Sequence, residues 1–110
     1  MPNSRSTNLY PKPVGGHTDQ TLAVDNTAGG VQFGAFSANC KYVVLDVQVA
    51  DVRVTYDGSA PDNTQDSGTA NGHILFAGRS YTWAVETARA AKFIEDTTTD
   101  AVIHASEFTD

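Results

Sequence analysis

The side chains of this 110-residue chain that could act as nucleophiles or bases are one cysteine and three histidines: Cys40, His17, His73 and His104. Hydrolysis needs a nucleophile, a base within hydrogen-bond reach and a group that orients the base. The sequence contains no G-x-S-x-G, no H-E-x-x-H and no cysteine pair, so no local motif supplies such a set. We therefore expect no enzyme. We expect Cys40, which precedes a strand, to be a small buried hydrophobic residue.

A polar loop that follows Gly58 holds a second group of candidate ligands. Oxygen donors clustered on a loop are what calcium prefers, and here they are Asp57, Asp62, Asn63 and Asp66. Their spacing does not match D-x-[DN]-x-[DN]-G, and Asp and Asn are also ordinary turn residues. We expect no metal and no cofactor. The sequence leaves open whether the loop from Ser59 to Gly72 binds another ligand.

Aromatic side chains are the third group, because exposed aromatics could bind a glycan. The candidates are Tyr10, Tyr56, Tyr81 and Trp83. Tyr81 and Trp83 lie on one face of a predicted strand, where large aromatics usually belong to the core. Glycan binding is therefore kept as an alternative function.

Length and charge restrict the classes of partner. The chain has the size of one domain. Its net charge of −6 and pI of about 4.7 would repel phosphate backbones, so we expect no nucleic-acid partner. The N-terminus has no apolar signal region, and no run of apolar residues reaches membrane-spanning length. We expect a protein made in a reducing cytoplasm that has no membrane partner.

The pattern that organises the chain is the alternation of apolar and polar residues from Tyr42 to Gly58. Leu45, Val47 and Val49 form one apolar series, and the alternation resumes at Val52 after Ala50-Asp51. A period of two is typical of strands. We predict two strands joined by a tight two-residue β connection.

Further short strands are predicted on both sides of this pair. They begin at Thr21, Val31, His73, Tyr81 and Ala101, and the short apolar segment Lys92-Phe93-Ile94 comes before the last of them. Thr87 to Ala91 is expected to be a turn, with at most one helical turn, and Glu95 to Asp100 a hairpin loop. The predicted fold is a single small antiparallel all-β sandwich or barrel-like domain of six to seven short strands, spanning residues 21–110.

Residues 1–20 are predicted to form an extended N-terminal arm, because they hold three of the four prolines and little apolar periodicity. A disordered tail is the alternative. If the arm lies on a neighbouring subunit or on another partner, the expected contact residues are Leu9, Tyr10, Pro11 and Pro13. His17 is given no role.

Four segments carry a resemblance to a known family. They are V-R-V-T-Y-D-G-S-A-P from Val52, N-G-H-I-L-F-A-G from Asn71, A-A-K-F-I from Ala90 and the ending V-I-H-A-S-E-F-T. Together they resemble a loose family of small tailed-bacteriophage virion proteins, over about Tyr42 to Thr109. Where the family has Pro-Thr after D-G-x-x, this chain has Pro61-Asp62 and a longer loop.

The resemblance implies a β-sandwich protein present in many copies on a capsid or at a head or tail junction. Our leading hypothesis is a capsid decoration, or cement, protein on the virion surface. It would bind and stabilise the shell of major capsid protein, and it would form a homotrimer. The alternatives are a head-fibre or tail module that binds a host receptor or glycan, and a head–tail joining or tail subunit.

Overall fold

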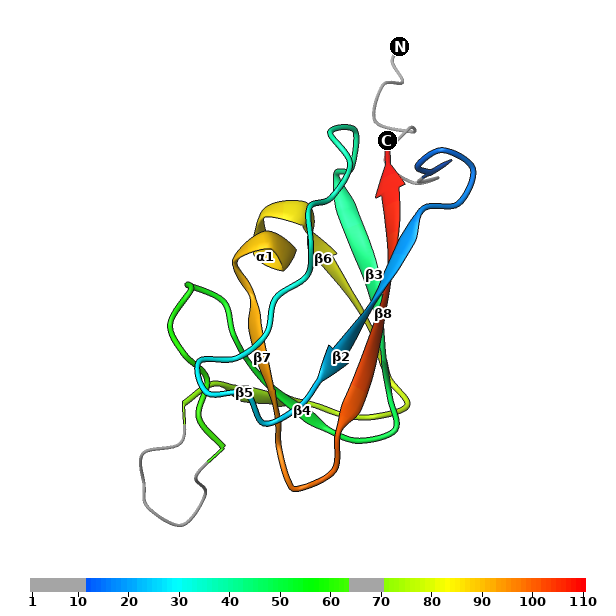
Figure 1. Cartoon of the computed structure of the whole chain (residues 1–110). Helices are drawn as coiled ribbons and strands as arrows, with labels where there is room; N and C mark the ends of the chain where they lie inside the picture. Colours follow the sequence, from blue (N-terminus) through cyan, green and yellow to red (C-terminus); the bar gives the residue numbers. More distant parts are fainter. Residues whose placement is uncertain (1–11, 64–70) are drawn as a thin grey trace.

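The computed structural model describes residues 12–63 and 71–110, which form eight strands and one short helix (Figure 1). The strands are β1 (Lys12–Pro13), β2 (Asp19–Val24), β3 (Tyr42–Gln48), β4 (Val52–Thr55), β5 (His73–Leu75), β6 (Ser80–Ala84), β7 (Lys92–Glu95) and β8 (Ala101–Thr109). The helix is α1 (Val85–Ala90). Among the described residues, no helix is long and apolar enough to cross a membrane.

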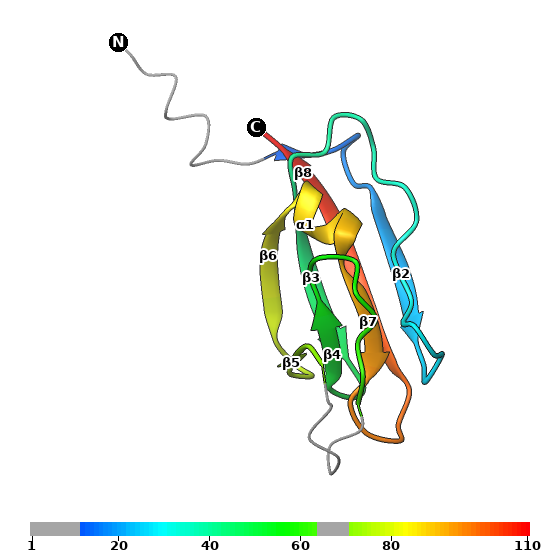
Figure 2. The same cartoon turned by 90° about the vertical axis from the view of Figure 1, so that its left-hand side faces the viewer.

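The strands make two antiparallel sheets. In the five-stranded sheet β8 lies at the centre. On one side it pairs with β3, which in turn pairs with β6. On its other side β8 pairs with both β1 and β2, each along a different part of its length. In the three-stranded sheet β4 lies between β5 and β7. The smaller sheet lies against one face of the larger (Figures 1 and 2). The all-β, sandwich-like prediction is confirmed, with eight strands in place of six or seven.

The core fills the space between the sheets, and the alternation predicted for the strands decides which residues enter it. On β3 the buried residues are Val43, Leu45 and Val47, while Asp46 and Gln48 are exposed. Phe93 of β7 is fully buried, and its ring stacks on Trp83 at 6.0 Å. Complete burial of one such side chain stabilises the fold by about 1.5–3 kcal/mol.

The connection between β3 and β4 differs from the prediction. The two strands do not pair: β3 pairs with β6 and β8, while β4 pairs with β5 and β7. The chain turns a corner from one sheet to the other, which lets both strands direct their apolar faces into one core. Val49 lies at this corner with a φ of 78° and is 72% exposed, so its predicted place on the buried face is wrong.

Replacing Val49 by glycine should stabilise the protein. A β-branched residue in the left-handed region costs about 1–2 kcal/mol, of which the greater freedom of unfolded glycine offsets about 0.5–1 kcal/mol. The expected gain of roughly 0.5–1 kcal/mol would be measured by urea denaturation. Val49→Ala is the matched control, because alanine keeps the Cβ and should show no such gain. Equal stabilities of the two variants would contradict strain at this corner.

Three further predictions need correction. The strand predicted from Val31 to Phe36 is reduced to an isolated bridge between Val31 and Phe93, although Phe33 and Phe36 are buried. The segment from Glu95 to Asp100 is no hairpin, since β7 and β8 belong to different sheets. The turn expected after Thr87 is part of α1, which buries two small side chains against the core. In each case core packing decided what local sequence left undetermined.

Glu95, at the end of β7, is a carboxyl group buried in the described structure. It is 3% exposed, and its Oε2 has no hydrogen-bond partner among the described residues. Burial raises its pKa, and a hydrogen bond with Asp100 and the charges of Asp100 and Asp25 raise it further. The unfolded chain therefore releases this proton at a lower pH than the native chain does. The contribution of Glu95 to native stability is therefore expected to fall as the pH rises above the ordinary value of 4.5.

Glu95→Gln removes this proton release and should therefore stabilise the protein at pH 7. The difference in free energy of unfolding should shrink toward pH 4, where the carboxyl group is protonated in both states. Urea denaturation at the two pH values measures the effect. Glu86→Gln, at an exposed site of α1, is the control and should show little change. If Glu95→Gln raises the free energy of unfolding equally at both pH values, the raised pKa of Glu95 is not the cause.

Candidate functional site: the root of the N-terminal segment

The first described residues are fixed to the central strand of the larger sheet. In β1, Lys12 and Pro13 pair with Thr109 and Phe108 at the end of β8. Val14 follows as a buried residue, and its N–H donates to the carbonyl of Glu107 at 3.0 Å. Because proline has no N–H to donate, an edge position suits Pro13. The chain thus enters the domain beside the last residues of β8.

This arrangement moves the predicted boundary between arm and domain. Lys12 to Gln20 were assigned to the arm, but β1 and the start of β2 belong to the sheet, and Val14 in the turn between them is buried in the core. No local pattern could signal this boundary, because a two-residue strand is too short to show a period. Pro13, a predicted contact residue, is exposed in β1. Leu9, Tyr10 and Pro11 lie outside the described residues.

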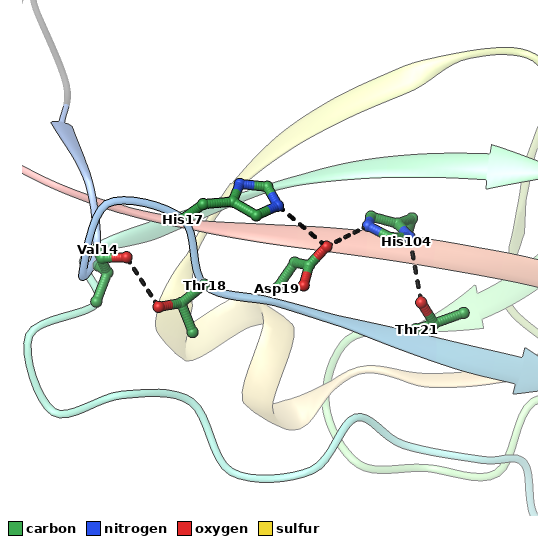
Figure 3. Close-up of polar contacts among 6 residues, drawn as sticks. All are labelled: Val14, His17, Thr18, Asp19, Thr21 and His104. Atoms are coloured by element: carbon green, nitrogen blue, oxygen red, sulfur yellow. Dashed lines mark hydrogen bonds and ion pairs between the residues drawn. The ribbon is translucent and has the colours of Figure 1, made fainter.

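A tight turn links β1 to β2. Gly15 and Gly16 have φ values of 60° and 87°, which residues with a side chain rarely adopt. The hydroxyl of Thr18 donates to the carbonyl of Val14 at 2.8 Å (Figure 3). The carbonyl of Thr18 accepts from the N–H of Glu107 at 2.8 Å. The turn is therefore bonded both to itself and to β8.

Two imidazoles then hold Asp19, the first residue of β2. His104 on β8 places Nε2 at 2.5 Å from Oδ2 of Asp19, and His17 in the turn places Nε2 at 3.3 Å from the same oxygen. The other nitrogen of His104, Nδ1, lies 3.1 Å from the hydroxyl of Thr21. In the neutral imidazole whose Nε2 donates to the carboxylate, Nδ1 accepts from Thr21; in the imidazolium both nitrogens donate. We call Asp19, His17, His104 and Thr21 the Asp19 clamp (Figure 3).

The clamp favours an ionised carboxylate. The hydrogen bond from His104 lowers the pKa of Asp19, partial desolvation opposes this, and the charges of His104 and His17 lower it further. The two imidazoles approach the carboxylate from opposite sides (Figure 3). In residues 12–63 and 71–110, no group of three histidine, cysteine or acidic side chains is arranged to hold a metal ion. Through its contacts with His17 and His104, the carboxylate of Asp19 joins the turn, β2 and β8 in a charge-assisted arrangement.

The clamp should weaken in acid. Because the native pKa of Asp19 is depressed, its stabilising contribution is present above the ordinary value of 3.8 and is lost as the pH falls through the native value. We expect the exchange protection of the Val14 amide, corrected for intrinsic rates, to decrease over this range. Asp19→Asn should show lower protection at neutral pH and little pH dependence. The same acid response in Asp19→Asn and the native chain would assign it to another group.

The remaining candidate residues take structural positions. Cys40 is buried as predicted, burial raises the pKa of its thiol, and its Sγ donates to the carbonyl of Tyr42 at 3.4 Å. Of the polar loop residues weighed as candidate calcium ligands, Asp57 accepts hydrogen bonds from Ser59, and Asn63 donates to the carbonyl of Glu95 at 2.7 Å. These contacts fix loop ends, as expected of turn residues. Asp66 and Tyr10 lie outside the described residues.

Of the aromatic residues weighed as glycan contacts, two are half-buried and one is exposed to solvent. Tyr81 and Trp83 on β6 are half-buried and pack against the core. Tyr56, just beyond β4, is 36% exposed. Its hydroxyl lies 2.6 Å from Nε2 of His73, a contact that no sequence spacing predicted.

Comparison of the chain with protein-family models, with curated proteins and with solved structures finds no match.

Proposed function

We propose that this chain is a structural protein of a tailed-bacteriophage virion, a capsid decoration protein that binds and stabilises the shell of major capsid protein. The observation that carries the proposal is the fixed root of the N-terminal segment. Its β1 strand, the buried Val14 and the Asp19 clamp fix the point at which residues 1–11 join the domain. A tether that transmits load between a domain and a lattice needs such a fixed root.

The composition of the domain agrees with this role. A net charge of −6 per chain opposes nonspecific aggregation of the free protein before it binds the shell. A small all-β domain without a catalytic motif is sufficient for a protein whose function is attachment. On a repeating lattice, many copies of a modest contact give tight overall binding through avidity. We propose a homotrimer, since three linked tethers would bind far more tightly than one.

The test is co-sedimentation of the purified full-length chain with bare shells of the phage that encodes it. The proposal predicts saturable binding, a copy number fixed by the lattice, and shells that resist heat better than bare ones. Light scattering of the free protein should give three times the 11.7 kDa mass of one chain. Binding at only six or twelve copies per particle would favour a head–tail joining subunit instead. Absence of binding to shells would refute decoration.

A further inference from the structure

A second surface feature lies on the smaller sheet, away from the N-terminal root. It is a hollow of about 480 Å³ at the end of β4 and the start of β5. We call it the Tyr56 hollow, and it is lined by Val54, Thr55, Tyr56, Asp57, Ser59, Asn71, Gly72 and His73. Its volume falls in the range of small-molecule sites, about 300–1,000 Å³.

The hollow exists because β5 is short. β5 pairs with β4 only from Val52 to Val54, and Thr55 pairs with β7 on the other side, so among the described residues no strand lies beside the chain on the β5 side beyond Val54. Gly72 makes the entry to β5 possible: its φ is 102°, and a Cβ there would lie 2.5 Å from the carbonyl oxygen of Val54. The backbone thus passes close to β4 and leaves the ring of Tyr56 open to solvent.

Tyr56 is held rigidly in this opening. Its ring packs edge-on against Trp83 at 5.3 Å between centroids and tilts against His73 at 5.0 Å. The hydroxyl contact with His73 fixes the outer end of the ring. Burial raises the pKa of Tyr56, so the hydroxyl keeps its proton at neutral pH. A ligand would therefore meet an ordered aromatic surface and would lose little binding energy in ordering it.

Polar groups with defined positions surround the ring. Asp57 accepts from the N–H and hydroxyl of Ser59, and these hydrogen bonds lower the pKa of its carboxyl. Asn71 donates to the carbonyl of Ala60 at 3.0 Å. Among the described residues, the lining contains one carboxylate and no lysine or arginine. This charge disfavours anions, while carboxylate and amide groups suit ligands rich in hydroxyls.

We propose that the Tyr56 hollow binds a neutral saccharide, with a sugar ring against Tyr56 and hydroxyls bonded at Asp57 and Asn71. An apolar sugar face on an aromatic ring and hydroxyls on flanking polar groups match this lining. The site lies on the smaller sheet and the N-terminal root on the larger. Saccharide binding therefore goes beyond shell attachment and does not require it.

The test is a titration of the full-length chain with neutral sugars, followed by ¹H–¹⁵N NMR and by fluorescence of Trp83, the single tryptophan. The probes are glucose, galactose, mannose, N-acetylglucosamine and their short oligomers, with glucuronic acid as an anionic comparison. We expect saturable shifts at residues 54–59 and 71–73 with a Kd of about 1 mM or lower for at least one neutral probe. Absence of shifts there with every neutral probe would overturn the proposal.

Variants connect the binding to the ring. Tyr56→Ala should weaken binding by about tenfold or more, whereas Tyr56→Phe should retain most of it. Phe76→Ala is the matched control, because Phe76 is exposed outside the hollow, and its affinity should not change. If Tyr56→Ala fails to fold, Asp57→Ala tests the polar side and should also lose affinity. Full affinity in folded Tyr56→Ala or Asp57→Ala would contradict the site.

Discussion

A chain that begins at Lys12 should fold normally and lose its binding to shells. The deletion removes Leu9, Tyr10 and Pro11 but keeps β1, Val14 and the Asp19 clamp. Because avidity multiplies the contribution of each tether, apparent affinity for the lattice should fall by about 100-fold or more. Co-sedimentation with bare shells measures the loss, and thermal denaturation measures whether the domain is intact.

A longer deletion supplies the contrast. A chain that begins at Thr21 loses β1, the buried Val14 and the carboxylate of the clamp, so it should unfold at a clearly lower temperature than the native chain. The two deletions separate attachment from folding, which one deletion of the whole predicted arm could not do. Full shell occupancy by the chain that begins at Lys12 would show that the contact surface lies elsewhere.

Asp96→Asn should strongly destabilise the protein although the substitution is conservative in size. Nη2 of Arg53 lies 3.0 Å from Oδ1 of Asp96, and the two side chains are only 12% and 8% exposed. Arg53 also donates from Nη1 to the carbonyl of Gly72, while its Nε has no partner among the described residues. Loss of the counter-charge leaves a nearly buried cation, at a cost of about 3 kcal/mol or roughly 10 °C in Tm.

Two controls test whether charge is the cause. Asp110→Asn makes the same chemical change at an exposed terminus and should alter stability by less than about 0.5 kcal/mol. The double variant Arg53→Met with Asp96→Asn removes both partners, and it should be less destabilised than the sum of the single variants. If the losses in free energy of unfolding of the two single variants add up to that of the double variant, the two side chains contribute independently.

The strands that the sequence predicted well are those with long alternation. β3 and β8 alternate over seven and nine residues, and a period of two reports which face is buried. The same period does not report which strand is the neighbour. For this reason β3 and β4, predicted as a pair, could belong to different sheets. For the segment from Val31 to Phe36 the burial was predicted but the strand was wrong, since Phe33 and Phe36 are buried although the segment forms only an isolated bridge at Val31.

The Asp19 clamp could not have been predicted, because it depends on strand register. His17 and Asp19 are close in sequence, but His104 is separated from Asp19 by 85 positions. They meet only because β2 pairs with β8 so that Thr21 lies opposite His104. The contact of Tyr56 with His73 likewise requires the β4–β5 pairing. Side chains of ordinary turn and strand types carry no local signal for such contacts.

The most direct test of the central claim is a cryo-electron microscopy reconstruction of bare shells incubated with the purified chain. A decoration protein predicts density of the size of this domain at every equivalent local symmetry axis of the shell, with the β1 end of the domain facing the capsid. Density confined to the tail or to its vertex, or shells that remain bare at saturating protein, would contradict it.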